Sequence, residues 1–522
     1  MPKKVFLIAA LLMGLVGVLG AQQKLVSPYE IDSKPSAANP IDARVLDLLH
    51  KRGIEPAYLC SDAVFVRRVY IDVIGTLPEP QDVRAYLEDR NAGKRAALIE
   101  SLLARPEFAD YRTMKWCDLL RVKAEFPINL WPNAVQGYHR WIYEAVRENR
   151  PYDQFVRELL TSSGSNFHTP AVNFYRAIQG RNPSSIAEAV ALTFMGERFA
   201  NWPEARRAGM TAFFSRVAYK QTAEWKEEIV CLDPAATGPL DAVFPDGTPV
   251  RIAPGTDPRQ VFADWLNSSD NPWFARNIVN RVWAWLMGRG IIHEPDDVRP
   301  DNPPVNPELL AYLEKELVKA KFDLRHVYRL ILNSGIYQQS PIARSNNPDA
   351  GALFAYYPVR RLDAEVLIDA LCRIGGEGES YSSAIPEPFS FIPETQRSIA
   401  LADGSITSPF LGMFGRPARD TGLESERSNQ ATDEQRLHML NSSHIQRKIE
   451  RSRRLNGLMR MTRGDRAAMV RWLYLMILSR PPVESELAAA ESYFKTSGLD
   501  DRRAAADLAW ALVNTKEFLY RH

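Results

Sequence analysis

The chain has 522 residues, of which 45% are hydrophobic and 25% charged, and its 65 lysines and arginines against 63 aspartates and glutamates leave a formal net charge of +2. A chain of this length exceeds what one hydrophobic core usually holds, so two or three domains are expected. The balanced charge excludes a global field that attracts nucleic acid or an anionic membrane, and we expect neither as a partner.

The first residues have the pattern of a secretory signal. Two lysines precede an apolar run, Val5–Leu19, and small residues follow before polar Gln22. This order is typical of a signal peptide, and the apolar run is shorter than the roughly 20 residues of a membrane-spanning helix. We therefore expect a signal peptide over residues 1–21, a spacer over 22–40, and an exported protein, periplasmic or secreted, with no membrane span after cleavage.

The next part of the chain, residues 41–230, predicts an N-terminal helical module. Apolar residues recur at helical spacing, and a Trp-Pro turn at Trp202-Pro203 precedes one further helix. The spacing predicts helices around residues 41–50, 97–102, 138–146, 155–160 and 186–195.

Residues 231–258 interrupt this helical pattern and predict a domain boundary. Proline, glycine and aspartate crowd the segment, and Asp246-Gly247 lies between short β-prone runs. An Asp-Gly pair in this setting indicates a β-hairpin.

A second helical module is expected over residues 259–522. Asn306-Pro307 predicts a helix start, with leucines at helical spacing after it, whereas residues 376–410 lose the helical period and predict a long loop or a small sheet. The expected fold is mainly α: a multi-helical body of two modules, with a short hairpin linker and a small irregular or β insertion.

Two segments of the chain resemble each other. They read RRVYIDVIGTLPEPQDVRAYL from Arg67 and RWLYLMILSRPPVESELAAAESYF from Arg471. Tyr70 and Tyr474 each precede a proline by eight positions, and each unit later ends in Glu-Phe. The two units are either a common helical corner or a duplication, and the matching order favours duplication.

The four cysteines do not form a recognisable metal or redox motif. Cys60, Cys117, Cys231 and Cys372 are too widely and irregularly spaced for a zinc knuckle or a Cys-x-x-Cys pair. They permit three disulfide pairings, but Cys117 and Cys372 lie in apolar helical patterns, where a buried free thiol is more common. We expect no obligatory disulfide framework and leave the pairing open. The eight histidines are scattered, so no metal or other cofactor is expected.

The helix expected after Asn271 is the first candidate for a functional role. It is apolar around most of its circumference, with Arg281 in a narrow polar strip and Trp283 nearby. A buried arginine needs a carboxylate or carbonyl partner. Arg281 is either an internal tether to Asp296 or Asp297, which we favour, or a binding residue together with Trp283.

The segment 414–444 is the second candidate. Its first part lacks helical period and carries six charged residues: Arg416, Arg419, Asp420, Glu424, Glu426 and Arg427. Thr432 then begins a helix with a capping-box glutamine three residues later, and His438 follows.

Two interpretations of this segment remain. In the first, carboxylates perform acid-base chemistry and arginines hold an anionic group. The candidate catalytic residues are then Asp420, Glu424, Glu426 and His438, and the candidate binding residues are Arg416 and Arg427, with Arg281 and Trp283. In the second, which we favour, the segment is a solvated or internally salt-bridged loop.

Several stretches resemble a family of exported bacterial proteins that pairs domain of unknown function 1549 with domain of unknown function 1553. They are VFVRRVYIDVIGTLPEPQDVRAYL, RPYDQFVRELL, NPWFARNIVNRVWAWLMGRGI, NPELLAYL, LILNSGIYQQS and FGRPARDTGLESERS. The first domain is sometimes called cytochrome-associated because some members carry a fused c-type cytochrome. The resemblance implies an exported, mostly helical protein with no established activity.

This chain departs from that family at one place. Many relatives carry Cys-x-x-Cys-His at the end of the helix that corresponds to residues 186–195. Here residues 196–201 read GERFAN and offer no sulfur or imidazole ligand. Haem and metal binding are therefore not carried over, and a redox function is disfavoured.

The leading functional hypothesis is a non-catalytic binding or assembly protein of the cell envelope, linked to polymer or carbohydrate handling, whose partner is an unknown protein or polysaccharide. The alternative is a hydrolase that uses segment 414–444, so whether the chain is an enzyme stays open. The hydrolase requires the candidate side chains to converge in a concave pocket beside Arg281 and Trp283.

Overall fold

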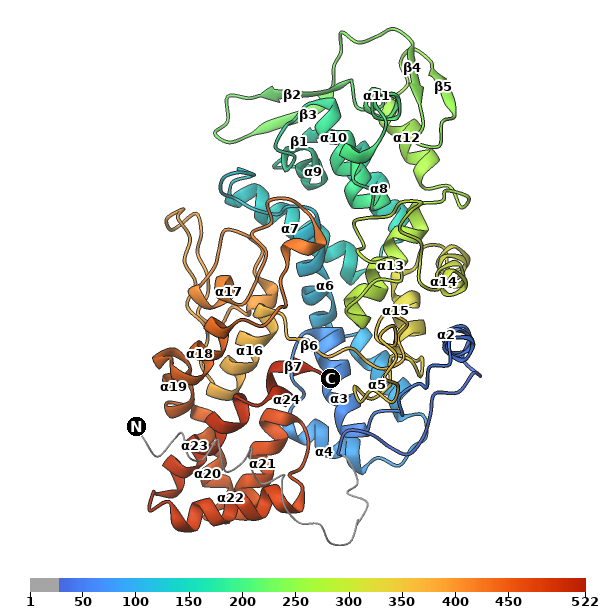
Figure 1. Ribbon diagram of the computed structural model, residues 1–522. Coiled ribbons are helices and arrows are strands. Elements are labelled where there is room, and N and C mark those ends of the chain that lie inside the picture. Colours follow the sequence, from blue (N-terminus) through green and yellow to red (C-terminus); the bar gives the residue numbers. More distant parts are fainter. Residues whose placement is uncertain (1–27) are drawn as a thin grey trace.

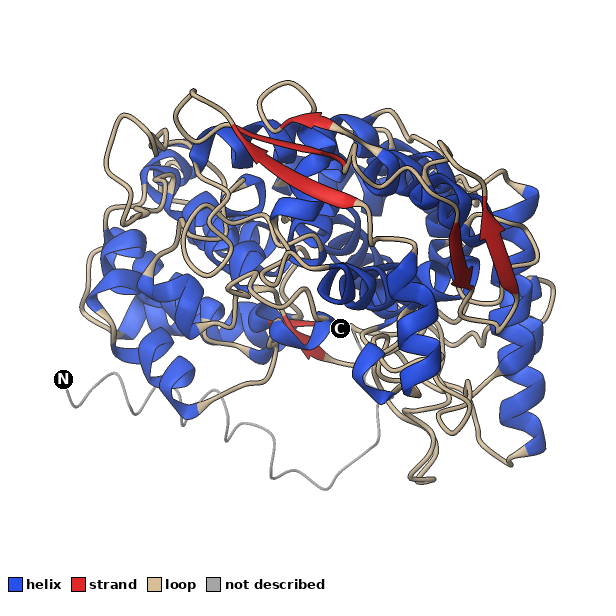
Figure 2. Ribbon diagram, turned by 90° about the horizontal axis from the view of Figure 1, so that it is seen from above, coloured by secondary structure: helices blue, strands red, loops and turns tan. Residues whose placement is uncertain are grey.

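The computed structural model describes residues 28–522, so the predicted signal peptide lies outside the described residues. Helices dominate the described part, and the strands form small sheets of two or three (Figures 1 and 2). The expected mainly α fold with small β elements is confirmed. No helix within residues 28–522 combines the length and the apolarity needed to cross a membrane.

The N-terminal part is a succession of helices, several of which begin with a proline. Four of the first six helices have proline in their first turn, where its missing N–H costs no hydrogen bond. The helices are α2 (Pro40–Lys51), α3 (Asp62–Ile74), α4 (Pro80–Glu88), α5 (Lys94–Leu103), α6 (Pro106–Leu119), α7 (Pro132–Arg147), α8 (Tyr152–Thr161), α9 (Asn173–Arg176), α10 (Pro183–Val190) and α11 (Glu204–Ala212).

The helix predicted over 186–195 changes its winding before it ends. After α10, residues Ala191–Met195 form a π-turn, which closes at Gly196 with a φ of +69°. A β-carbon on Gly196 would lie 2.9 Å from the carbonyl oxygen of Pro295, so this close approach requires glycine.

The strands of this region lie between α8 and α12. β1 (Gly164–Ser165), β3 (Glu228–Leu232) and β2 (Val217–Gln221) form one antiparallel sheet in that order. β4 (Leu240–Val243) and β5 (Pro249–Ile252) pair with each other, with Val243 opposite Pro249. Asp246-Gly247 lies in the turn between β4 and β5, so the predicted hairpin is confirmed.

The C-terminal part is again helical. Its helices are α12 (Pro258–Leu266), α13 (Phe274–Met287), α14 (Pro307–Lys319), α15 (Leu324–Leu332), α16 (Ala364–Gly375), α17 (Pro409–Met413), α18 (Asp433–Asn441), α19 (Ser443–Glu450), α20 (Arg453–Thr462), α21 (Arg466–Leu478), α22 (Glu484–Thr496), α23 (Asp501–Val513) and α24 (Lys516–Leu519). Asn306 caps α14 and Thr432 caps α18, as predicted. Two short strands, β6 (Arg360–Arg361) and β7 (Tyr520–Arg521), pair with each other. Between α16 and α17 the chain is irregular apart from the 3-10 turn Ser398–Ala400, which agrees with the expected loop.

Two apolar cores organise the molecule. The first takes nearly all its residues from Ile41 to Tyr357 and so runs across the predicted boundary at 231–258. The second gathers residues 362–518 together with four side chains from the α3–α6 region. The first core includes residues from both sides of segment 231–258. The boundary between two modules at this segment therefore remains a prediction.

The internal similarity extends to packing. Helix α3 contacts α4, α5 and α6, and α21 contacts α22, α23 and α24. Both first helices end on a left-handed residue, Gly75 at φ +61° and Ser479 at φ +59°. The two sequence units therefore form equivalent helical corners.

All four cysteines are free thiols. Cys117 is buried on α6, as predicted, and burial raises its pKa to about 12. Burial also raises the pKa of Cys372, which is partly buried, to about 12. Both thiols are therefore protonated and unreactive at neutral pH.

Candidate functional site

The charged loop, residues 414–428, folds back into the protein. A β-carbon on Gly415 would lie 2.0 Å from the carbonyl oxygen of Ser428, and the φ of Gly415 is +78°. The Ser428 amide donates to the Gly415 carbonyl at 3.1 Å, which closes the loop. Arg419 is fully buried and Arg416 is 9% exposed. Both arginines are therefore buried, while Thr421 and Ser425 remain exposed.

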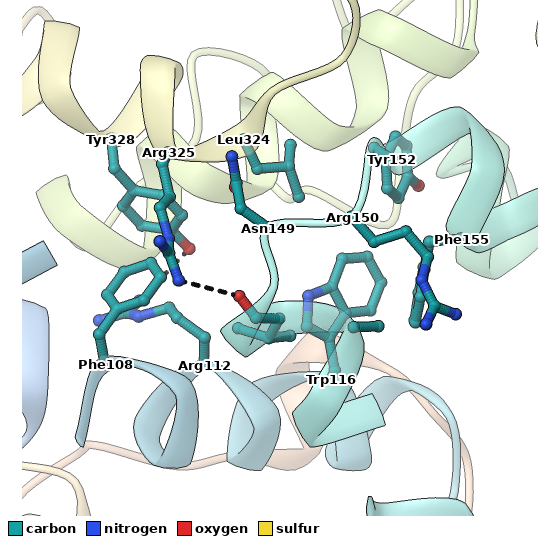
Figure 3. A pocket seen from close by; sticks show the side chains of 12 residues that line it. Phe108, Arg112, Trp116, Asn149, Arg150, Tyr152, Phe155, Leu324, Arg325 and Tyr328 are labelled. Carbon is teal, nitrogen blue, oxygen red and sulfur yellow. Dashed lines mark hydrogen bonds between the residues drawn. The ribbon is translucent and has the colours of Figure 1, made fainter. Parts of the chain in front are cut away.

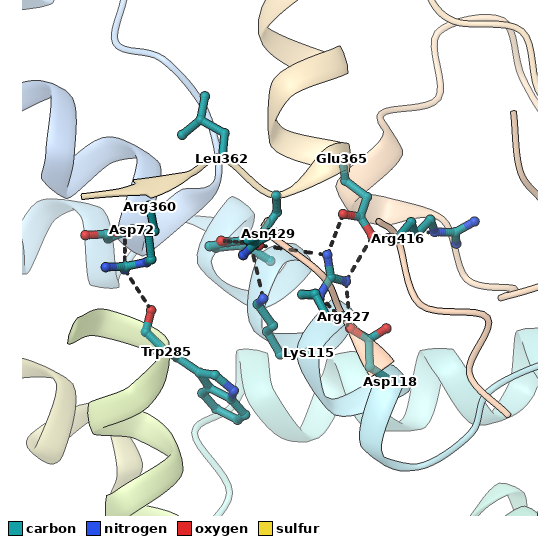
Figure 4. Close-up of polar contacts among 12 residues, drawn as sticks. Asp72, Lys115, Asp118, Trp285, Arg360, Leu362, Glu365, Arg416, Arg427 and Asn429 are labelled. Carbon is teal, nitrogen blue, oxygen red and sulfur yellow. Dashed lines mark hydrogen bonds and ion pairs between the residues drawn. The ribbon is translucent and has the colours of Figure 1, made fainter. Parts of the chain in front are cut away.

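Arg427 is the centre of a buried ion-pair network (Figure 4). Its guanidinium donates to Asp118 on α6 at 2.6 Å and to Glu365 on α16 at 2.7 Å. Arg419 donates to the other oxygen of Asp118 at 2.9 Å. Burial opposes the charge of Arg427, but Asp118 and Glu365 outweigh it and hold the pKa of Arg427 well above its ordinary value. The loop thus pairs with α6 and α16, and the arginine is permanently charged.

A second group of charges continues this network through the β6–β7 pair. Arg521 on β7 donates to Asp363 at 2.8 Å and lies 3.3 Å from Asp72 on α3. The ammonium of Lys115 lies 3.2 Å from Asp363. Burial alone raises the pKa of Asp363, but Lys115 and Arg521 outweigh it and hold that pKa well below the ordinary value. Arg360 on β6 lies 3.4 Å from Asp72.

A cavity of about 240 Å³ opens onto this network, and we call it the basic pocket. Its charged lining residues are Lys115, Arg289, Glu294, Arg360, Asp363, Glu424, Arg427 and Arg521, and Trp285 and His293 also line it. Five cationic side chains thus face three carboxylates. The lining therefore holds two more cationic than acidic side chains, although Asp118, Glu365 and Asp72 behind it pair with Arg427, Arg360 and Arg521.

Glu424 and Lys115 are two pocket residues whose pKa values shift toward the neutral form. Glu424 accepts a hydrogen bond from the Trp285 indole at 2.9 Å and lies 3.5 Å from Arg281. Burial raises the pKa of Glu424 above its ordinary value, although Arg281 and Lys115 lower it. Burial lowers the pKa of Lys115, and Arg427 lowers it further. Perturbed groups facing one cavity are typical of functional sites.

Arg281 is the internal tether that the sequence predicted. It is 1% exposed and lies 2.6 Å from Asp296, which is equally buried. Asp297 pairs instead with Arg299 at 3.1 Å.

Trp283, a candidate binding residue, does not line the basic pocket. It is fully buried against Phe354, with ring centroids 5.1 Å apart. Trp285 lines the pocket instead. Two residues turn a helix by about 200°, so the neighbouring tryptophan faces the opposite direction.

The remaining candidates do not converge. Asp420 pairs with Lys123 at 2.6 Å outside the basic pocket. Glu426 accepts the backbone amides of Asp420 and Thr421 at 3.0 and 3.1 Å, which shapes the loop. Of the four candidate catalytic residues, Glu424 alone lines the basic pocket.

His438 and Arg416 also lie elsewhere. The His438 ring packs against Phe410 and Phe414, with centroids 5.8 and 6.1 Å apart. Arg416 donates to the carbonyl of Asp403 at 3.1 Å and lies 3.5 Å from Glu365, behind the pocket. Of the candidate binding arginines in the loop, only Arg427 lines the pocket.

A larger cleft of about 650 Å³ lies on the other side of the loop. Its wall includes Arg198 to Asn201, from the segment where relatives carry Cys-x-x-Cys-His. Arg198 lies 3.8 Å from Glu294 of the basic pocket, so the two rims meet at this ion pair. Within residues 28–522, no group of three histidine, cysteine or acidic side chains is placed to hold a metal ion.

A third cavity is too small for a ligand. It measures about 40 Å³ and lies among Phe108, Trp116, Phe155 and Tyr328, where Arg325 donates to the carbonyl of Val146 at 3.2 Å (Figure 3). This volume holds no more than a few waters.

Apart from Arg427, the sequence missed the cationic residues that line the pocket. Lys115 lies on α6 between Arg112 and Asp118, at three-residue spacing in an otherwise apolar helix. Charged residues at this spacing on a helix indicate that they share a face and, if buried, need charged partners. Arg360 and Arg521 had no such signal, because only the pairing of β6 with β7 brings them together.

Comparisons with known families agree with this architecture. Residues 40–205 match the family described as "Protein of unknown function (DUF1549)", and residues 258–494 match "Protein of unknown function (DUF1553)". The chain belongs to the proteins that pair these two domains, which confirms the predicted resemblance. No curated protein and no solved structure matches the chain.

Proposed function

We propose that the chain is a binding protein whose basic pocket receives an anionic group, such as a carboxylate, sulfate or phosphate ester. The observation that carries this proposal is the excess of cationic side chains lining the cavity, where the side chains of Lys115, Arg427 and Arg521 are 8%, 6% and 3% exposed. Charge-assisted hydrogen bonds from buried arginine and lysine are strong and suit these oxyanions.

The size of the pocket defines what enters it. At about 240 Å³ it is smaller than the usual 300–1,000 Å³ of small-molecule sites. It therefore holds one charged group of a larger molecule. An acidic residue of an envelope polysaccharide has this chemistry, which supports a role in polymer handling.

The test uses two lysines that are alike except for their position. Lys115 and Lys123 are 8% and 12% exposed, and each pairs with one aspartate, but Lys123 does not line the basic pocket. Binding of glucuronate, sulfate, phosphate and neutral glucose is measured by isothermal titration calorimetry. We expect an anion to bind, glucose not to bind here, and Lys115→Met to weaken anion binding at least tenfold while Lys123→Met does not. Absence of binding by every anion, or equal loss in both variants, contradicts the proposal.

A second candidate function is acid-base catalysis at the same pocket. The supporting observation is that Glu424 has a raised pKa and Lys115 a lowered one across a single cavity. Glu424 is then the proton donor of a hydrolase. This reduces the four candidate catalytic residues of segment 414–444 to one. Glu424→Gln abolishes turnover of a glycoside or ester panel in that case and leaves anion binding intact.

Export to the cell envelope remains part of the proposal. It is supported by the sequence of residues 1–21 and by the resemblance to exported proteins. Fractionation of cells that express the full chain, with detection of a shortened product outside the cytoplasm, tests it.

A further inference from the structure

Three aromatic rings from three separate loops meet at the protein surface, away from the lining of the basic pocket. Trp131 and Trp225 have ring centroids 4.9 Å apart and planes inclined by 77°. Phe389 lies 5.8 Å from each of them, inclined by 58° and 55°. The rings therefore form the walls of a corner, which we call the aromatic corner. Trp225 is 60% exposed and Phe389 is 45% exposed.

Specific contacts hold the loops that carry these rings, and the ammonium of Lys226 lies 4.6 Å from the centroid of the Trp131 ring. A carboxylate oxygen of Glu125 accepts the Ser383 hydroxyl at 3.1 Å and the Ala384 amide at 3.0 Å, which joins the first loop to the third. The side-chain amide of Asn166 donates to the carbonyl of Lys226, which holds the β2–β3 turn. Trp131 adopts a φ of +71°, which is uncommon for a bulky residue. The corner is thus held in place before any ligand arrives, which reduces the entropic cost of binding.

The large apolar side chains that these loops expose are all aromatic. Within residues 125–131, 222–227 and 383–391, the large exposed apolar side chains are Phe126, Trp225, Phe389 and Phe391. The larger aliphatic residues of the same loops, Ile128, Leu130 and Ile385, are buried. A general hydrophobic interface mixes large aliphatic and aromatic side chains, whereas the large apolar side chains exposed here are all aromatic.

The charge of the loops excludes a polyanion. The three segments hold one lysine, Lys226, against four carboxylates: Glu125, Glu224, Glu227 and Glu387. Nucleic acids and anionic lipid surfaces require cationic surroundings. The corner therefore suits an uncharged ligand that offers flat C–H faces and hydroxyl groups.

We propose that the aromatic corner binds neutral pyranose rings of a glycan. The C–H groups on one face of a pyranose carry partial positive charge, and the negative face of an aromatic ring attracts them. The carboxylates around the corner accept hydrogen bonds from sugar hydroxyls. This site is separate from the basic pocket and does not depend on the function proposed for that pocket.

The test changes the ring at Trp225, which is exposed enough for substitution without loss of fold. Binding of cellohexaose, xylohexaose and chitohexaose to the full chain is measured by isothermal titration calorimetry. Trp225→Leu keeps apolar surface without a π face, and Trp225→Tyr keeps a π face. We expect Trp225→Leu to lose at least tenfold in affinity, Trp225→Tyr to stay within about threefold, and Arg84→Met, at a side chain on α4 that is 59% exposed, to bind like the unmodified protein.

Two results overturn the inference. One is that none of the three oligosaccharides binds. The other is that affinity is equal in Trp225→Leu and Trp225→Tyr, which indicates general hydrophobic contact. In the first case, Trp225-dependent binding of single-stranded DNA or of phosphatidylcholine vesicles assigns the corner to another partner.

Discussion

Single residues in this protein are governed by the cost of burying charge. Arg281 and Asp296 are each 1% exposed and lie 2.6 Å apart, so neither is tolerable without the other. The sequence predicted this pair because an arginine in an apolar helix needs a partner and two aspartates follow nearby. It did not predict Lys115 or Arg521, whose partner Asp363 is hundreds of residues away in the chain.

Asp369 should make stability depend on pH. Burial raises its pKa to about 6, although the amides of Ser398 and Ile399 and the nearby Arg397 lower it. The unfolded carboxyl titrates near 3.9, so between about pH 4 and pH 6 the folded state binds more protons than the unfolded state. Asp369 therefore contributes fully to the free energy of unfolding below about pH 4, and this contribution is lost as pH rises through about 6. The loss is at most about 3 kcal/mol.

Asp369→Asn removes this titration. Urea unfolding of both proteins between pH 4 and pH 7 measures the effect as the difference between their free energies of unfolding. We expect the original protein to lose stability relative to Asp369→Asn as pH rises. A difference that is independent of pH contradicts the assignment.

At the scale of secondary-structure elements, local signals were reliable. The caps Asn306 and Thr432 and the turn at Asp246-Gly247 were all predicted, because a cap or turn is made by residues a few positions apart. The π-turn at Ala191–Met195 was not predicted, because Gly196 there packs against the Pro295 region of a later segment.

Gly415 should be required for the shape of the charged loop. Its φ of +78° and the approach of the Ser428 carbonyl leave no room for a β-carbon. Gly415→Ala should lower the free energy of unfolding by about 2–4 kcal/mol, from backbone strain together with the displaced contact. It should also weaken anion binding, because Arg427 is in the same loop.

Gly412 provides the control for this substitution. It lies in α17 with no atom within 4 Å of an added β-carbon, and its φ is not positive. Gly412→Ala should leave stability and binding unchanged or slightly improved, since alanine favours a helix. Equal unfolding midpoints for Gly412→Ala and Gly415→Ala in urea refute the role of Gly415.

The whole molecule is joined through α3. Arg67 donates to the carbonyls of Ile477 at 2.8 Å and Phe518 at 3.1 Å, and both lie in the C-terminal helices. Arg68, its neighbour, donates to the carbonyl of Gln339 at 2.8 Å. One helix near the start of the described chain thus provides hydrogen bonds to carbonyls of both cores.

Removing this connection should destabilise the protein. Arg67→Met leaves two buried carbonyls without donors, at a cost of about 2–4 kcal/mol. Arg84→Met is the control, because Arg84 on α4 is 59% exposed. We expect this substitution to change the free energy of unfolding by no more than about 0.5 kcal/mol. Limited proteolysis should cut the α21–α24 region faster in Arg67→Met, and equal cutting in both variants contradicts the proposed connection.

The sequence by itself determined the helical fold, its caps, the hairpin, the family pairing and the Arg281 tether, because periodicity and short-range hydrogen bonds are encoded within a few residues. Only the tertiary structure decided which charges meet. Arg427 reaches Asp118 and Glu365, and Arg521 reaches Asp72 and Asp363, across separations that no local pattern records. Burial then decided which of these charges line a pocket, because a side chain's exposure depends on every segment packed around it.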